Sequence, residues 1–219
     1  MMAGYTWEQY LEFINGVPPD QQEIDFFSSV GWVRPYLQVS SPFTPIPFFS
    51  RFEKGNSNDR FFNKIINTPG TISNALGLVR KENDWATRFA VATNNGNAGT
   101  SQKQKEPDFI LLAHLGTDLS GFTDTAHGGV LGALFDEAMS CCAELFRQAS
   151  DRKSQLFTAN LSVSYRAPVD VPAVVMIRIW LERRDGRKWF LRGKLTGEDG
   201  AVKAEAEALW ISAKTKENL

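Results

Sequence analysis

The sequence predicts an α+β domain in which one antiparallel sheet wraps around a single long helix. Residues 128–148 are rich in alanine and leucine and contain no proline, so they predict a helix of more than about five turns. A short apolar segment at 109–115 predicts a strand before this helix. Four alternating segments after the helix predict further strands, at 157–166, 173–181, 189–195 and 201–211. Because short turns join only adjacent antiparallel strands, these four form a meander packed against the helix.

The N-terminal third predicts an extension that precedes the main domain. We divide the chain into an extension over residues 1–70, partly extended and partly helical, and a domain over 71–219. Residues 5–15 are typical of a short amphipathic helix, and residues 42–49 alternate prolines with aromatic side chains. That alternation predicts an extended segment. The segment is either a strap, laid across the domain or across a partner subunit, or a plain linker.

Two further segments complete the predicted layout. Residues 58–66 are expected to form another short helix of the extension. Its apolar side chains are expected to face the core: Phe61, Phe62, Ile65 and Ile66. Residues 93–106 combine Asn, Gly, Ser, Gln and Lys with a single alanine, which predicts a mobile loop.

Composition and charge bound the class of protein. With 219 residues, 42% hydrophobic content and sixteen phenylalanines, the chain can bury one substantial core. A net charge of −1, without a dense cluster of Lys and Arg, argues against a nucleic-acid partner. No segment approaches the ~18 apolar residues that span a bilayer, and the first residues lack the pattern of a signal peptide. We therefore expect a cytoplasmic protein, with the adjacent Cys141 and Cys142 as buried thiols rather than a disulfide.

The start of the predicted helix carries the most informative motif, His127-Gly128-Gly129. The first turn of a helix leaves backbone N–H groups without partners, and its dipole favours an oxygen that is becoming negative. Because the glycines have no Cβ, the oxygen of a ligand can approach this backbone closely, as in an oxyanion hole. Asp136 follows about two turns into the helix, where a carboxylate can act as a base or a nucleophile.

Helical periodicity leaves a second interpretation of Asp136 open. Asp136 falls with Glu137, Ser140 and Glu144 on one polar arc, while the opposite side of the helix is apolar. By periodicity alone, Asp136 is also consistent with a solvated surface acid. Glu137 is the rival acid; because it points about 100° away from Asp136, we assign it to the polar face or to an interface.

Several motifs in the C-terminal half resemble one enzyme family. His127-Gly128-Gly129 with Asp136, the stretch Thr158-Ala-Asn-Leu-Ser-Val-Ser-Tyr-Arg-Ala-Pro168, and Gly186-Arg187-Lys188 are similar to the hotdog-fold acyl-CoA thioesterases. The resemblance runs from about Asp108 to the end of the chain. The similar group includes the phenylacetate-pathway and 4-hydroxybenzoyl-CoA thioesterases, and the chain is most similar to the branch with a TANL strand. It implies a hotdog fold and hydrolysis of an acyl-CoA or acyl-carrier thioester to acid and thiol. It also implies a homodimer or homotetramer, with no cofactor and no metal.

The resemblance assigns roles to the residues at the start of the helix. The thioester oxygen would accept a hydrogen bond from the Gly128 N–H, with Gly129 as a further substrate contact. Asp136 would attack the carbonyl or activate a water molecule, and His127 would orient the loop and the thioester.

The resemblance also assigns roles on the strand after the helix. Thr158 would come from a partner subunit and hold the water or the carboxylate, although its β-propensity alone explains it about as well. Asn160 shares the face of Thr158 if the strand alternates regularly, and so becomes a candidate substrate contact. One position departs from the family, because some relatives carry Asn or Gln where this chain has Gly121.

Two other functions remain open at this stage. Hotdog hydratases and dehydratases share the fold, but their D-x-N-P-x-H and H-F-P signatures are absent from this chain. A protein that binds acyl-CoA without turnover is favoured by the long extension and by Gly121. The second histidine, His114, lacks acidic or cysteine neighbours at metal-ligand spacing, so we expect it in a strand or the core.

Overall fold

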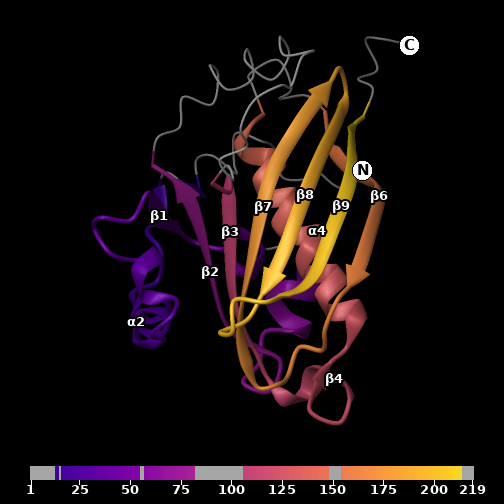
Figure 1. Ribbon diagram of the computed structural model, residues 1–219. Coiled ribbons are helices and arrows are strands. Elements are labelled where there is room, and N and C mark those ends of the chain that lie inside the picture. The colour runs from indigo at the N-terminus through magenta and orange to yellow at the C-terminus, as the bar shows by residue number, and fades with distance from the viewer. Residues whose placement is uncertain (1–12, 15, 55–56, 82–105, 148–153, 214–219) are drawn as a thin grey trace, which may run out of the picture.

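The computed structural model describes residues 13–14, 16–54, 57–81, 106–147 and 154–213. Across these residues, a seven-stranded antiparallel sheet curves around the helix α4, Gly128–Leu145 (Figure 1). The strand order is β1-β2-β3-β7-β8-β9-β6. The strands are β1 (Phe43–Ile46), β2 (Ile72–Arg80), β3 (Phe109–Leu115), β6 (Leu156–Tyr165), β7 (Ala173–Asp185), β8 (Lys188–Thr196) and β9 (Val202–Ser212). The predicted α+β hotdog arrangement is confirmed. The prediction that the four strands after the helix form one meander is wrong, because β6 pairs with β9 and not with β7, the next strand along the chain.

Shorter elements connect these parts. Before the sheet lies α2, Gln21–Ser29, followed by the 3₁₀ helices η1 (Arg34–Tyr36) and η2 (Phe49–Arg51). The five-residue π-helix η3, Phe61–Ile65, precedes β2. Between β3 and α4, η4 (Thr117–Leu119) leads into a small hairpin of β4 (Ser120–Phe122) and β5 (Thr125–Ala126).

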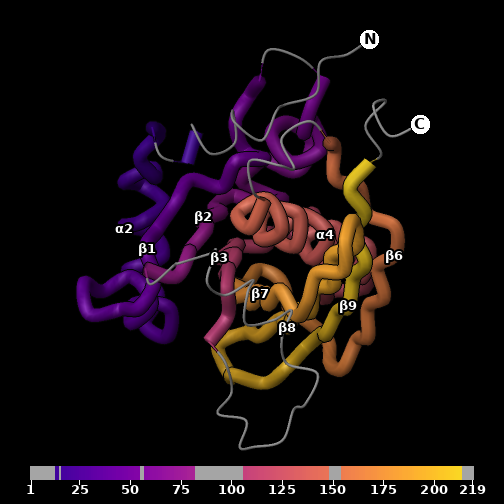
Figure 2. The backbone as a smooth tube through the Cα atoms, turned by 90° about the horizontal axis from the view of Figure 1, so that it is seen from above, coloured from indigo at the N-terminus to yellow at the C-terminus, as the bar shows by residue number. Residues whose placement is uncertain are grey.

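The core lies on both faces of the sheet because alternate residues of β3 point to opposite sides. Phe109 and Leu111 pack in the cluster around α4, whereas Ile110 and Leu112 pack in a second cluster with Phe27 of α2. This double burial explains why the first five residues of β3, 109–113, are all apolar. Figure 2 shows α2 and α4 on the two sides of β2 and β3.

The extension is part of the same packed unit as the rest of the chain. The predicted extended segment at 42–49 contains β1, which pairs with β2 at the edge of the sheet. Further along, Phe48 and Ile66 join the core around α4. The division at residue 70 stays a prediction, and the expected loop at 93–106 and most of the expected helix at 5–15 lie outside the described residues.

The expected helix at 58–66 is shorter than predicted and buries only half of its apolar side chains. Phe62 and Ile66 are 5% and 6% exposed, but Phe61 and Ile65 are 45% and 62% exposed. The prediction that all four face the core is therefore wrong. A single turn rests on the domain with one side only, so the side chains on its other side remain in solvent.

Candidate active site

The N-terminus of α4 is closed by its own histidine. His127 is the N-cap with an extended backbone, and its Nδ1 accepts a hydrogen bond from the Gly129 N–H at 3.0 Å. The Gly129 N–H is thus already used. In the part of the chain that the structure describes, the Gly128 N–H has no hydrogen-bond partner, so it is the N–H of this pair that remains for a ligand.

Two neighbours explain the glycines around this turn. A Cβ on Gly121 would lie 2.9 Å from Cδ2 of His127, so no side chain fits there, and the amide that some relatives carry has no room. A Cβ on Gly128 would lie 3.1 Å from Cζ of Tyr165. The Tyr165 hydroxyl donates to the Gly128 carbonyl at 2.7 Å. No local sequence pattern indicates this contact, because Tyr165 and Gly128 are 37 positions apart.

Asp136 is a partly buried acid with a specific partner. The Thr158 hydroxyl of β6 donates to Oδ1 of Asp136 at 2.8 Å. Burial raises the pKa of the Asp136 carboxyl above its ordinary value, and the hydrogen bond from Thr158 acts in the opposite direction. Asp136 is therefore not a freely solvated surface acid. The expectation that Thr158 reaches this carboxylate from a partner subunit is wrong, because both residues lie on one chain.

Asn160 does not share the face of Thr158. In the register between β6 and β9, Thr158 stands opposite Trp210 and Asn160 opposite Leu209, with a bulge between them. Since Trp210 and Leu209 point to opposite faces of β9, the bulge turns Asn160 away from Asp136. The prediction of a shared face is wrong for this reason, and a substrate contact of Asn160 stays a prediction.

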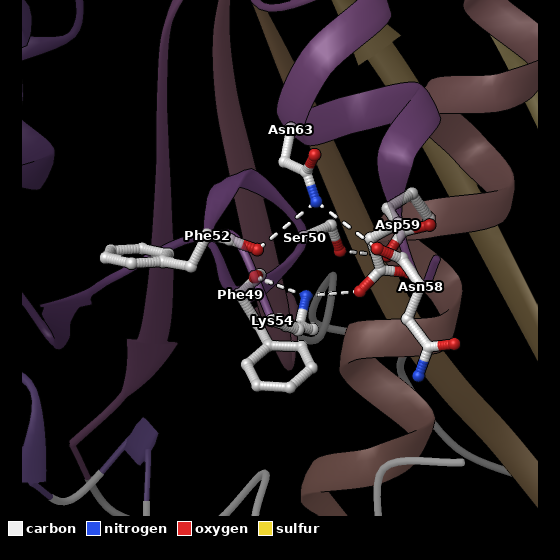
Figure 3. A network of polar contacts seen from close by, with 8 residues as sticks. Phe49, Ser50, Phe52, Lys54, Asn58, Asp59 and Asn63 are labelled. Atoms are coloured by element: carbon white, nitrogen blue, oxygen red, sulfur yellow. Dashed lines mark hydrogen bonds and ion pairs between the residues drawn. The ribbon is translucent and has the colours of Figure 1, made fainter. Parts of the chain in front are cut away.

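Glu137, the rival acid, is held by the extension. The Ser50 hydroxyl of η2 donates to Oε1 of Glu137, across 87 positions in the sequence. Near this contact Lys54, whose side chain is 2% exposed, pairs with Asp59. Figure 3 shows Ser50, Lys54 and Asp59 close together in one network of polar contacts. Glu137 therefore supports the docking of the extension on α4, a contact that no local sequence pattern indicates.

The environment of Glu137 shifts its titration strongly. Burial raises the pKa of its carboxyl from 4.5 to about 7; Asp59 and Asp136 act in the same direction, while Ser50 and Lys54 oppose it. The folded state therefore binds this proton more tightly than the unfolded chain does. As a consequence, the stability that this group contributes is present in acid and is lost as the pH rises from about 4.5 to 7.

We expect Glu137→Gln to remove this pH dependence of stability. Between pH 4.5 and 7, the free energy of unfolding of the wild type should fall by roughly 2–3 kcal/mol more than that of the variant. Urea unfolding at both pH values measures the difference. Glu198→Gln, which changes an exposed glutamate in the turn before β9, is the matched control and should behave like the wild type. Parallel pH curves for wild type and Glu137→Gln would contradict the assignment.

Comparison with known proteins bears on the segment that contains these residues. The family model that matches is described as the thioesterase superfamily, and it covers residues 123–204. Residues 123–204 match the thioesterase superfamily. The resemblance expected from the sequence is thereby confirmed for this segment, which includes His127, Gly128, Asp136, Thr158 and Tyr165.

Curated relatives match about half of this chain. The chain is 30% identical over 103 residues to the acyl-coenzyme A thioesterase THEM4 of Bos taurus, covering 47% of this chain and 40% of that protein. It is 31% identical over 98 residues to the uncharacterized mitochondrial membrane protein FMP10 of Saccharomyces cerevisiae, covering 43% and 39%. The chain therefore spans about two fifths of the length of these relatives.

A solved structure is similar to about half of the chain. It is a hypothetical thioesterase with coenzyme A from Streptococcus pneumoniae TIGR4, with 15% identity, a TM-score of 0.44, and coverage of 51% of this chain and 84% of that chain. Among the described residues, no helix is long and apolar enough to cross a membrane. The cytoplasmic location stays a prediction.

Three further residues with predicted positions are His114, Cys141 and Cys142. His114 is in β3, as predicted, where its Nδ1 lies 2.6 Å from the Ser73 hydroxyl. Cys141 and Cys142 are both buried and do not form a disulfide, also as predicted. Within the described ranges, no group of three or more His, Cys, Asp or Glu side chains is arranged to hold a metal ion.

Proposed function

We propose that this protein hydrolyses thioesters of acyl groups, with coenzyme A or an acyl-carrier protein as the leaving group. The observation that carries the proposal is the hydrogen bond between Thr158 and Asp136, a partly buried carboxylate within the segment that matches the thioesterase superfamily. The acyl-coenzyme A thioesterase name of the THEM4 relatives supports the same chemistry. The open Gly128 N–H supplies a donor for the oxygen that becomes negative.

The reaction follows from these groups. Asp136 either takes a proton from a water molecule that attacks the thioester carbon or attacks that carbon itself. The carbonyl oxygen becomes negative as the new C–O bond forms, and the Gly128 N–H stabilises it. The C–S bond then breaks, and the thiolate leaves as the free thiol after taking up the proton that Asp136 removed from water or, in the covalent route, a proton from solvent. In the covalent route a water molecule then hydrolyses the acyl–Asp136 anhydride, which releases the acid and restores the carboxylate. Thr158 keeps the Asp136 carboxylate oriented during these steps.

The geometry of α4 supports a site shared between two chains. Gly128 and Asp136 are eight residues apart, so about 12 Å of helix rise separates them. One thioester carbon cannot lie within bonding reach of both. In a two-fold symmetric homodimer, Gly128 of one chain can face Asp136 and Thr158 of the other, which forms two equivalent sites. We propose such a homodimer, which in a homotetramer would pair again.

The edge strand β6 supports the same assembly. Within the described sheet, β6 pairs with β9 on one side and has no strand on its other side. Two of its large side chains, Phe157 and Tyr165, are 55% and 54% exposed. An open edge with exposed aromatic residues is suited to pairing with the same strand of a second copy.

Thiol release tests the proposed function directly. Purified protein is incubated with a panel of aryl- and fatty acyl-CoA esters, and the free thiol is followed with a chromogenic reagent. We expect release well above the rate without protein for at least one ester. Binding of the esters without release from any of them would instead support the acyl-CoA-binding function and overturn the proposal.

A further inference from the structure

One peptide group at the start of α4 carries two hydrogen bonds in series. The carbonyl of Gly128 accepts from the Tyr165 hydroxyl at 2.7 Å, and the N–H of Gly129 donates to Nδ1 of His127 at 3.0 Å. Both atoms belong to the peptide between Gly128 and Gly129. A hydrogen bond to the oxygen of an amide polarises it and strengthens its N–H as a donor. Tyr165 therefore strengthens the bond that holds the imidazole of His127.

This chain of bonds determines which ring nitrogen of His127 carries the proton. Nδ1 accepts the Gly129 N–H, so it cannot carry a proton itself. A neutral imidazole must then have its proton on Nε2. In the described part of the chain Nε2 has no protein partner, and the side chain is exposed. The structure therefore leaves a free Nε2–H donor beside the N-terminus of α4.

The surroundings indicate what this donor serves. His127 directly precedes Gly128, whose N–H also lacks a partner among the described residues. The ring occupies the space that any side chain at position 121 would need, at 2.9 Å from Cδ2. A second side-chain donor to the thioester oxygen can therefore not come from position 121. His127 can supply it, because it directly precedes the Gly128 N–H.

We infer that Tyr165 is a positioning residue that acts through the Gly128–Gly129 peptide, holding His127 so that its Nε2–H is the second donor to the thioester oxygen. The inference rests on the proposed function for its substrate, but its structural part can be measured without substrate. Tyr165 itself does not contact the reacting atoms. It sets the tautomer and the orientation of the ring that does.

The test is Tyr165→Phe, which keeps the ring beside Gly128 and removes only the hydroxyl. Nitrogen-15 NMR under mildly alkaline conditions reports the tautomer of each imidazole, and the chain has only two histidines. His114 of β3, which contacts Ser73 of β2, is the internal reference. Tyr36→Phe is the matched control, because it removes a hydroxyl that contacts Arg178 on the other face of the sheet.

We expect His127 of the wild type to be the Nε2–H tautomer, and Tyr165→Phe to populate the Nδ1–H tautomer measurably while His114 is unchanged. We also expect kcat to fall about 3- to 10-fold, the range for loss of one hydrogen bond, with KM within about two-fold. An unchanged His127 tautomer in Tyr165→Phe, or an unchanged kcat despite a shifted tautomer, would overturn the inference. If Tyr165→Phe shifts the tautomer of His127 but the wild type releases no thiol, only the proposed function is refuted.

Discussion

Replacing Asp136 by asparagine is expected to lower the turnover of thioester hydrolysis at least ~100-fold, the scale typical of a lost general base. The amide has the shape of the carboxylate, and its oxygen can still accept the hydrogen bond that Thr158 donates at 2.8 Å. The fold around α4 is therefore retained, while the proton-accepting charge is lost. Steady-state kinetics of thiol release, with circular dichroism as a check on folding, measure the effect.

Glu137→Gln is the matched control for this substitution. Glu137 is the next residue along the helix and an acid as well, but its carboxyl contacts Ser50 of the extension rather than Thr158. We expect its turnover to stay within a few-fold of the wild type. If Glu137→Gln abolishes turnover and Asp136→Asn leaves it intact, Glu137 is the catalytic acid and the assignment is wrong.

Replacing Gly128 by proline is expected to lower kcat by at least about 100-fold, because proline has no N–H to donate to the thioester oxygen. The position suits proline otherwise. Gly128 is the first residue of α4, where proline is favoured, and the preceding His127 has φ −64° and ψ 130°, the extended backbone that a following proline requires. The change therefore removes one donor with little effect on the helix.

Gly128→Ala separates the lost donor from crowding. Alanine adds the same Cβ beside the Tyr165 ring but keeps the backbone N–H, so we expect kcat within a few-fold of the wild type. If kcat falls equally in Gly128→Pro and Gly128→Ala, the loss comes from crowding against the Tyr165 ring and not from the missing N–H.

Mixed dimers of the two inactive variants test the shared site. If Gly128 of one chain works with Asp136 of the other, a heterodimer of Gly128→Pro and Asp136→Asn contains one site without either substitution. With random association of equal amounts, about a quarter of the wild-type activity should return. A mixture that stays inactive would show that each chain uses its own Gly128 and Asp136.

The sequence predicts those parts of the fold that depend on residues close together in the chain, and not those that depend on contacts between distant segments. The long helix and the strands after it were predictable because hydrophobic periodicity is set by neighbouring residues. The apolar run of β3 predicted a strand, but its second buried face depends on Phe27 of α2, more than eighty positions away. The two exposed side chains of η3, Phe61 and Ile65, were mispredicted because a local pattern does not show which side of a short turn meets the domain.

The candidate site divides in the same way. The sequence by itself determined the His127-Gly128-Gly129 start of α4 and the position of Asp136 along it, because the first turn of a helix always leaves its N–H groups open. Only the tertiary structure decided that Thr158 contacts Asp136 within one chain, that Tyr165 contacts Gly128, and that Ser50 contacts Glu137. A bulge in β6 reverses the face of Asn160 by a single residue. Contacts between distant segments, and the register that brings them together, depend on packing of the whole chain, which the periodicity of one segment does not contain.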